Sequence, residues 1–421
     1  MIKSLIEHAK KEGISLEVFA RTEKSNEISI LNDILEKFDS SYITNYKIKA
    51  FFNNRNVTIE TDHICVDDII QTIKQVAKIT DDDNQDSFAT ESICSEIIDD
   101  PELDYNKIAK DLLSLNSLKV KYPLLNSISL LFSHYYEKIN IDNENAKLED
   151  ANYYNYFYAE IVAKDKDIVQ TDFFDFVSKE YDFEKLKEKL TNKIEETINR
   201  IHSNSCKTAK YNIILKDRCT YKILNAFSSM FSADLINKKQ SILVDKLGKQ
   251  VFSSKITIVE DPTNVLLAGK RLFDDEGVKT QYKEIVKDGK FVSKLYNNQT
   301  ALKENRKSTG NSYGVRNMYI VPGDKNEQEL IEMLDEGIII TDIQGLHAGI
   351  NKINGKISLQ ASGYYVKDSK KVKALDMIVL STDLFELFNN IKEVGSDLNY
   401  FSRFGGAPSL LIENITVAGK E

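Results

Sequence analysis

The stretch QGLHAGINKINGKISLQASGYY, residues 344 to 365, shows the pattern that decides the fold of the C-terminal half of this chain. Its second part alternates, with apolar residues on one face of an extended chain and Ser358 and Gln360 on the other. The glycines of its first part allow tight turns where one strand passes to the next. The pattern is typical of strands joined by short turns, and it presents one histidine, His347, in a glycine loop.

The chain from about residue 208 onward has the same sequence pattern. Strand-like runs alternate with Gly, Asn and Asp turns, and these runs are YNIIL, KITIVED, KISLQASGYYV, DMIVLST and SLLIENITV. Two short amphipathic helices, TYKILNAFSSMF and TDLFELFNNI, interrupt them. We therefore expect a mainly antiparallel-β domain with short helices over residues 209–421.

The first 95 residues alternate strand and helix patterns. ISLEVFA, YKIKAFF and NVTIE have the period of strands, whereas VDDIIQTIKQVAKI has an apolar helical stripe with Asp67 and Asp68 at its positive N-terminal end. We expect an N-terminal α/β domain over residues 1–95. The acidic run DDDNQDS that follows, residues 81–87, lacks the Gly and Glu of an EF-hand loop and is interpreted as a solvated boundary loop.

A central helical and β segment is expected over residues 96–208. It contains the helix pattern DYNKIAKDLLSL, the strand pattern NYYNYFYAEIVA and the amphipathic helix FEKLKEKLTNKIEETINRIH. Tyr154, Tyr156 and Tyr158 share one face of the strand, where they could stack on bases or grip a peptide. Simple packing on a half-buried sheet is the favoured interpretation. The fold class of the whole chain is therefore predicted to be α+β.

Composition narrows the class of protein. A chain of 421 residues suggests two or three domains, and its net charge of −9 without a basic patch argues against nucleic-acid binding. No apolar run approaches the roughly 18 residues of a membrane span, so we expect no membrane partner and a cytoplasmic location. The four cysteines are expected to be mostly reduced and buried, because their wide spacing suggests neither disulfides nor a zinc knuckle; they are Cys65, Cys94, Cys206 and Cys219.

The residues able to carry chemistry are few. The five histidines are isolated from one another in sequence and none lies in HExxH; they are His8, His63, His134, His202 and His347. The chain also lacks a G-x-S-x-G elbow, a Walker A loop and a dinucleotide G-x-G-x-x-G.

The best acidic group is the run RLFDDEGVKTQ, where Asp274, Asp275 and Glu276 precede Gly277. Clustered carboxylates can bind a hard cation or act as acid and base, but acids before a glycine also mark an exposed turn. Because no base accompanies them in sequence, the turn is the favoured interpretation.

Several ordered motifs resemble the PmbA (TldE) branch of the TldD/PmbA family. They are FDDEGVKTQ, STGN at 308–311, GLHAGINKINGKISLQASGYYV, GSDLNYF and GAPSLLIENITVAGK, and they cover most of residues 209–421. The resemblance implies a peptidase-like protein that processes or degrades peptides, of a family also called modulators of DNA gyrase.

The resemblance also implies where a metal would be bound. In the TldD branch a helix carries HExxxH and a downstream cysteine completes the site. The corresponding positions here are Leu224, Asn225 and Ser229, and RFGGAPS, residues 403–409, has glycines in place of the cysteine segment. None of these supplies an imidazole, a catalytic carboxylate or a thiolate, so no metal, cofactor or catalytic residue is expected in this chain.

The resemblance implies a metal-free subunit that partners a TldD-like zinc metalloprotease in a heterodimer and helps to hold an unfolded peptide; a homodimer is also possible. We expect strand segments 357–366 or 152–158 to line the cleft, by addition of the peptide to a sheet edge. The candidate substrate-binding residues are His347, Gly345, Gly349, Ser358, Gln360, Asp274, Asp275 and Glu276.

Two alternatives remain open at this point. One is a self-sufficient peptidase that uses His347 with Asp274, Asp275 and Glu276. The other is a non-proteolytic modulator that binds DNA gyrase or an antitoxin. If the chain is a metal-free subunit, His347 is expected to hydrogen-bond to the backbone of its loop, because the other ligands that a metal would need are absent.

Overall fold

The structure is a computed structural model that describes residues 1–31, 33–82, 88–94 and 98–420. Residues 83–87 of the acidic run predicted to form a boundary loop lie outside the described residues. Cys206 and Cys219 are buried, Cys65 is half-buried, and the side chain of Cys94 is outside the description.

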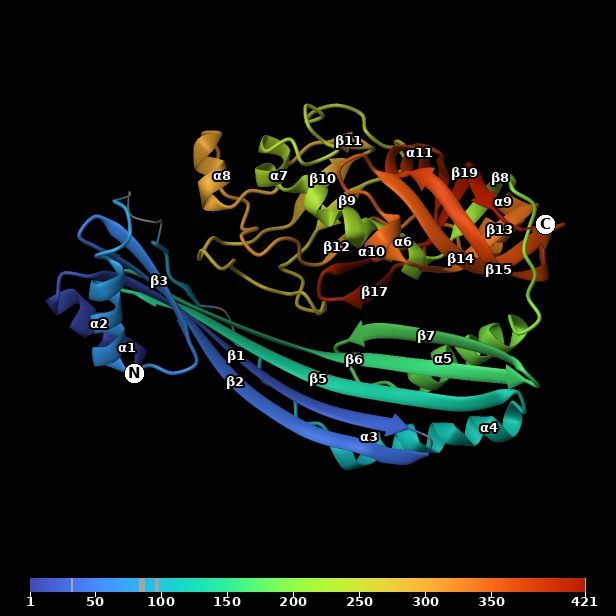
Figure 1. The fold of residues 1–421 in the computed structure, drawn as a ribbon, viewed down its shortest axis with the longest axis horizontal. Helices are drawn as coiled ribbons and strands as arrows, with labels where there is room; N and C mark the ends of the chain where they lie inside the picture. The colour runs from blue at the N-terminus through green and yellow to red at the C-terminus, as the bar shows by residue number, and fades with distance from the viewer. Residues whose placement is uncertain (32, 83–87, 95–97, 421) are drawn as a thin grey trace.

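The N-terminal region consists of one long curved sheet and the helices that cover it (Figure 1). Its elements are α1 (Ile2–Lys11), β1 (Ser15–Leu31), β2 (Ile34–Phe52), β3 (Arg55–Thr61), α2 (Val66–Val76), β4 (Ile93–Cys94), α3 (Tyr105–Ser114), the 3-10 helix η1 (Leu115–Ser117), α4 (Leu118–Lys121), β5 (Leu125–Asn143), β6 (Lys147–Asp165), β7 (Ile168–Ser178) and α5 (Phe183–Asn199). The predicted α2, α3 and α5 helices and the tyrosine-rich strand are therefore confirmed.

The curved sheet has seven strands in the order β3-β2-β1-β5-β6, with β7 and the short β4 both on the outer edge of β6. All of its pairs are antiparallel except β4 with β6, so the N-terminal region is not a parallel α/β unit. Strands from the predicted segments 1–95 and 96–208 share this sheet, because β1 pairs with β5 from Glu17 to Leu31.

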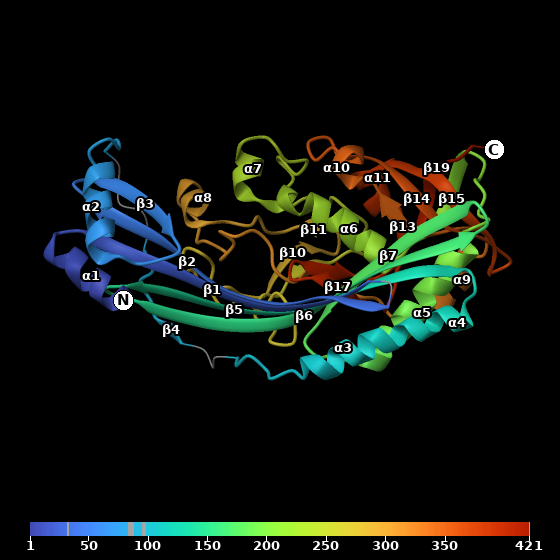
Figure 2. The ribbon, with the colours of Figure 1, turned by 60° about the horizontal axis from the view of Figure 1, so that its bottom comes forward.

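Helices cover the sheet in two places. At one end, α1 and α2 pack Leu5, Ile70 and Ile73 against Val18 and Ile48 of the sheet. Further along, α3 and α5 pack on the face that carries Phe132 and Phe157, and Figure 2 shows them on the side of the sheet away from the C-terminal region. The opposite face of β6, with Tyr154, Tyr156 and Tyr158, is left to meet the C-terminal region.

The C-terminal region contains two six-stranded sheets and short helices. Its elements are β8 (Ala209–Leu215), α6 (Asp217–Phe227), the 3-10 helix η2 (Ser228–Phe231), α7 (Ala233–Asn237), β9 (Ile258–Glu260), β10 (Lys283–Lys287), β11 (Lys290–Phe291), α8 (Asn298–Lys303), β12 (Met318–Ile320), α9 (Glu327–Leu334), β13 (Gly337–Gln344), α10 (Leu346–Gly349), β14 (Lys356–Lys367), β15 (Lys370–Asp383), α11 (Leu384–Asn389), β16 (Ile391–Val394), β17 (Asn399–Ser402), β18 (Gly405–Ala407) and β19 (Leu410–Ala418).

One sheet has the order β11-β10-β9-β12-β18-β17, and the other has the order β15-β14-β13-β8-β19-β16. In the second sheet β15 also pairs with β19, as Leu380 does with Val417, so β15, β14, β13, β8 and β19 form a closed ring. Closure leaves these strands without free edges. The expected α+β class, with a C-terminal region rich in antiparallel strands, is confirmed.

The two regions are joined by buried polar contacts as well as by the chain. Arg200, at the end of α5, pairs with Asp172 of β7 at 2.5 Å and also donates to Ser362 of β14. Lys270 forms a buried ion pair with Asp150 of β6. Such contacts fix the curved sheet beneath the C-terminal region, as Figure 1 shows. No helix in the described part of the chain is long and apolar enough to cross a membrane.

Candidate functional site

A polar pocket of about 460 Å³ lies where η2, α7 and α8 meet the loop that contains the STGN motif. Its lining includes Ser229, Ser232, Thr300, Asn311 and Ser312. Ser229 is one of the three positions that correspond to the metal helix of the TldD branch. The pocket therefore occupies the part of the fold where the family resemblance leads us to look for a site.

The wall formed by Asn311 is held by a buried acid. Asn311 Nδ2 donates to both carboxylate oxygens of Glu260, at 3.0 and 2.9 Å, and Thr309 Oγ1 donates to Asn311 Oδ1 at 2.8 Å. Glu260 is fully buried, and it also accepts from Lys283 Nζ at 2.5 Å and from the backbone of Arg316 at 2.7 Å. These bonds fix one orientation of the Asn311 amide. Sequence reasoning missed Glu260, although an acid at the end of the apolar run KITIVED was a signal.

The chemistry of the pocket is that of hydroxyl and amide groups. Such groups donate and accept hydrogen bonds, but they are neither bases nor usual zinc ligands at neutral pH. Within its lining the charged side chains are Asp234 on α7 and Lys238 directly after it, which pair with each other at 2.8 Å. This arrangement is suited to holding a polar chain such as a peptide backbone.

A larger hollow of about 860 Å³ lies between α1 and the turn from β5 to β6. Charged groups around it already neutralise one another, as Lys10 pairs with Glu144 at 3.0 Å. None of the family motifs lies there, so we place the candidate site at the Ser229 pocket.

The acidic turn, Asp274 to Glu276, makes contacts that hold the loops next to the pocket. Asp274 is fully buried and accepts from the backbone of Glu276 at 2.9 Å, Val278 at 3.0 Å and Ser312 at 3.0 Å. Asp275 pairs with Arg271, and Glu276 accepts from the backbone of Asn298 at 2.8 Å. Burial raises the pKa of the Glu276 carboxyl, and the negative Asp274 adds to this shift. All three acids are used in contacts that order the loops around the pocket.

His347 lies away from these acids on the short helix α10, between β13 and β14. Its side chain is exposed, and in the described part of the chain no hydrogen bond or ion pair joins it to Asp274, Asp275 or Glu276. The expected hydrogen bond to the backbone of its own loop is likewise absent among the described residues. An exposed imidazole gains little from such a bond, because water satisfies it equally well.

The other residues predicted around His347 are brought together on the outside of the strand ring. Ser358 and Gln360 are exposed on one face of β14, and a Cβ on Gly349 would lie 2.2 Å from the carbonyl oxygen of Ser358. Gly349 therefore lets α10 lie directly on the strand. Gly345 has a φ of +81°, which starts the turn into α10.

The predicted addition of a peptide to the edge of strand 357–366 is wrong, and for strand 152–158 it is excluded only from Asn155 onward. β14 pairs with β13 on one side and β15 on the other, and β6 lies between β5 and β7 from Asn155 onward. In these paired stretches the backbone groups are already hydrogen-bonded, so a peptide can be met there only through side chains.

The metal positions do not fit zinc. Leu224 is fully buried in the main C-terminal core, and neither the amide of Asn225 nor the hydroxyl of Ser229 is a usual zinc ligand. A Cβ on Gly405 would lie 1.8 Å from the carbonyl oxygen of Met318, and one on Gly406 would lie 2.1 Å from that of Asn399. A cysteine at either glycine would require the strands to separate.

The described residues also contain no group of three or more His, Cys, Asp and Glu side chains that could hold a metal ion. The donor set of this chain, as far as it is described, thus disagrees with the zinc site implied by the TldD branch.

The fold and the site together define a domain of the metallopeptidase type with Leu224, Asn225 and Ser229 at the ligand positions. Residues 208–419 match the family described as the PmbA/TldA metallopeptidase C-terminal domain. The chain belongs to the PmbA/TldE family.

Curated relatives agree with this assignment. A protein of Buchnera aphidicola (strain APS) named "Metalloprotease PmbA homolog" is 30% identical over 274 residues, which are 65% of this chain and 60% of that protein. "Metalloprotease PmbA" of Escherichia coli O157:H7 is 26% identical over 224 residues, 53% of this chain and 49% of that protein. The matches thus span about half to three fifths of the relatives' lengths.

Solved structures show that the fold extends over the whole chain. A Thermotoga maritima protein described as a modulator of a DNA gyrase has a TM-score of 0.89 and 24% identity, covering 99% of both chains. TldE of Thermococcus kodakarensis has a TM-score of 0.84 and 19% identity, covering 99% of this chain and 100% of its own. These similarities establish the fold of residues that the family domain does not cover.

Proposed function

We propose that this chain is a metal-free subunit that partners a TldD-like zinc metalloprotease, the two acting as a cytoplasmic heterodimer on unfolded peptides. The chain contributes walls of the substrate cleft and hydrogen bonds to the peptide, and zinc is bound by the partner.

One observation carries the proposal: a preorganised polar pocket stands where the metal helix should be, but its residues cannot bind zinc. Leu224 is buried in the core, while Ser229 and Asn311 line the pocket. Asn311 is fixed by the buried Glu260, and fixing polar groups in advance reduces the entropy lost on binding. A pocket maintained without catalytic groups is best explained by binding.

The first experiment measures zinc and peptidase activity for the chain alone, for a partner with HExxxH alone, and for the two mixed. We expect stoichiometric zinc in the partner, and cleavage of an unfolded peptide only in the complex. Stoichiometric zinc in the isolated chain, or cleavage by it, would favour the self-sufficient peptidase instead.

A second experiment tests the pocket within the complex. Ser229→Phe fills the pocket, and we expect KM for an unfolded peptide to rise about 10-fold or more with little change in kcat, as for loss of uniform binding. Gln328→Ala removes an exposed amide on α9 and serves as the matched control, with unchanged kinetics. If Ser229→Phe leaves KM unchanged, the pocket does not hold the peptide.

Affinity capture distinguishes the remaining alternative. Recovery of a protein that carries HExxxH supports the heterodimer, whereas recovery of gyrase without such a protein favours the non-proteolytic modulator. Recovery of the chain only with itself favours a homodimer and removes the basis for a zinc-bearing partner.

A further inference from the structure

A cluster of four arginines surrounds one acid between the curved sheet and the C-terminal region. Glu137 of β5 pairs with Arg21 of β1 at 2.6 Å. From the C-terminal region, Arg316 and Arg403 approach the same carboxylate, each with a nitrogen at 3.7 Å, and the charge of Arg271 acts on it as well. We call these five residues the arginine cluster.

The cluster contains more positive than negative charge. Arg271 also pairs with Asp275, and Arg21 also pairs with Glu23 at 2.8 Å, so three carboxylates serve four guanidiniums. Arg316 and Arg403 have no acid of their own among the described residues. Burial lowers the pKa of Arg316, and the nearby positive charges of Arg271 and Arg403 lower it further against the opposing effect of Glu137.

Several buried donors in the cluster have no acceptor. The Arg316 side chain is 6% exposed, yet it makes no hydrogen bond to another described residue, since 3.7 Å is too long. Arg271 Nε and the hydroxyl of Tyr313 are buried and also lack a hydrogen-bond partner among the described residues. The Tyr313 ring lies between the two arginines, at 4.6 Å from Arg271 and 5.0 Å from Arg316. Buried charges without hydrogen bonds are costly, so this arrangement is expected to serve a ligand.

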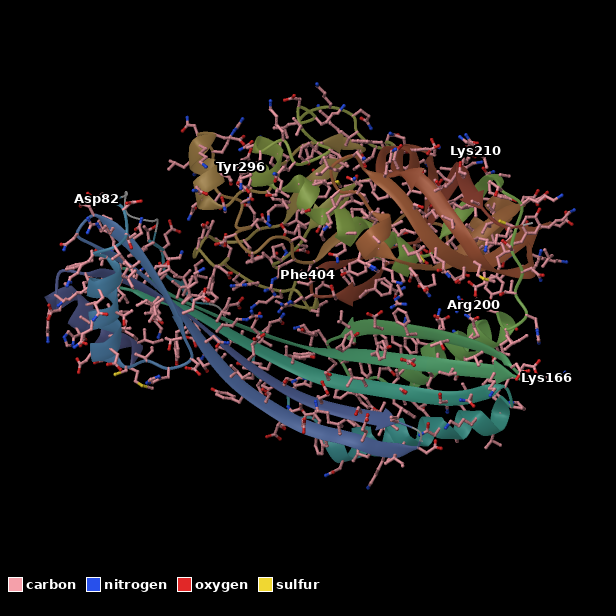
Figure 3. All side chains as sticks on the ribbon, in the orientation of Figure 1. Asp82, Lys166, Arg200, Lys210, Tyr296 and Phe404 are labelled. Carbon is pink, nitrogen blue, oxygen red and sulfur yellow. The ribbon has the colours of Figure 1, made fainter. Side chains whose placement is uncertain are left out.

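The cluster can be reached from solvent on one side. The side chains of Arg21 and Arg403 are 31% and 28% exposed. Arg403 lies over the ring of Phe404, which is 38% exposed, and Figure 3 places Phe404 on the side of the C-terminal region that faces the curved sheet. An apolar ring next to unpaired guanidiniums can receive a side chain and an anionic group of the same ligand.

We propose that the arginine cluster binds a carboxylate of a peptide, either its C-terminal carboxylate or an acidic side chain, with Arg316 and Arg403 as the principal donors. This inference rests on the proposed function in one respect, namely that the ligand is a peptide. Guanidiniums match a carboxylate because two parallel N–H groups can meet its two oxygens. Tyr154, Tyr156 and Tyr158 share one half-buried face of β6, and the charges of Arg403, Glu137 and Arg316 act on Tyr154. This face offers a surface for the rest of the peptide.

The test measures binding to the purified chain without any partner. Three labelled hexapeptides of the same apolar core are compared by fluorescence anisotropy: a free C-terminus, a C-terminal amide, and an amide with one internal Asp. We expect the free-acid or the Asp peptide to bind about 10- to 100-fold more tightly than the neutral amide, the range of a charge-assisted hydrogen bond. Which of the two prevails identifies the source of the carboxylate.

Variants at the accessible side keep the test independent of folding. Arg403→Gln, and separately Arg403→Ala, should remove most of the preference for acid over amide while the thermal unfolding midpoint shows that the chain is folded. Arg306→Gln changes an exposed arginine elsewhere and should keep the preference. The inference is overturned by equal affinities for acid and amide, by no binding of any peptide, by binding of inorganic phosphate alone, or by a preference that survives in both variants.

Failure here is distinguishable from failure of the proposed function. A complex that contains zinc and cleaves peptides, combined with no preference for the acid peptides, would reject only the carboxylate site. A clear preference in a chain that never joins a zinc-bearing partner would reject only the heterodimer.

Discussion

Asn311 in the wall of the polar pocket donates to both oxygens of the fully buried Glu260, at 3.0 and 2.9 Å. Through this one acid the pocket is connected to Lys283 on β10 and to the backbone of Arg316 before β12. The site is therefore as rigid as the sheet beneath it, and a change in the buried acid should affect both stability and binding.

Glu260→Gln should destabilise the fold by about 3–5 kcal/mol, because it leaves the buried ammonium of Lys283 without a counter-charge. Urea unfolding of the purified chain measures this difference. Glu284→Gln is the matched control, since Glu284 pairs with Lys287 at 3.0 Å on the surface and should change stability by less than about 1 kcal/mol. Equal effects of the two substitutions would contradict the structural role of Glu260.

Glu137 should make stability depend on pH in the acid range. Burial alone would raise the pKa of its carboxyl, but Arg316, Arg271, Arg21 and Arg403 outweigh burial and lower the pKa from 4.5 to about 2. A carboxyl whose pKa is lower in the folded state stabilises that state above pH 4.5, and this contribution is lost as the pH falls toward 2.

The contribution of Glu137 is at most about 3 kcal/mol, from the size of this pKa shift. Glu137→Gln should lower the free energy of unfolding at neutral pH by this amount. The free energy of unfolding of the variant, measured by urea titration, should also fall less steeply between about pH 4.5 and 2. Glu413→Gln, at an exposed acid, should follow the unmodified chain. Parallel curves for Glu137→Gln and the unmodified chain would show that the arginines do not lower this pKa.

Lys179 should make the stability of the fold depend on pH in the alkaline range. Burial, with a smaller effect of the positive Lys270, lowers the pKa of its ammonium to about 8, although Asp150 opposes the shift. The unfolded chain then keeps the proton up to about pH 10.5, so the free energy of unfolding should rise between pH 8 and 10.5 by up to about 3 kcal/mol.

Lys179→Met removes this rise, and urea unfolding between pH 7.5 and 10.5 measures it. Comparison with Lys246→Met, at an exposed lysine, isolates the buried group from the other titrating lysines and tyrosines. A difference between Lys179→Met and the unmodified chain that does not vary with pH would be inconsistent with the lowered pKa.

Restoring the residues of the metal helix should not restore a metal site. The triple change Leu224→His, Asn225→Glu and Ser229→His should destabilise the fold by about 2–5 kcal/mol, because position 224 lies in the apolar core. We expect less than one zinc per chain by elemental analysis, since strand packing at Gly405 also excludes a cysteine ligand. Ser229→His alone should be tolerated, and stoichiometric zinc in the triple variant would refute this account.

The sequence by itself was sufficient to predict the individual helices and strands and to recognise the family. The apolar stripes of α2 and α5, the alternation in β14 and the tyrosine face of β6 all appear in the structure as their periods predict. Periodicity works at this range because it records which side of a helix or strand is apolar. The motifs around STGN and His347 likewise sufficed to recognise the PmbA/TldE family.

Only the tertiary structure decided which elements meet. The pairing of β1 with β5, the ring closed by β15 and β19, and the convergence of Arg21, Glu137 and Arg403 all join residues more than 30 positions apart. The period of a strand is the same whichever neighbour it pairs with, so no local pattern could indicate these contacts. The same reason explains why the predicted free edge of β14 was wrong, and why Glu260 and the arginine cluster were found only in the folded chain.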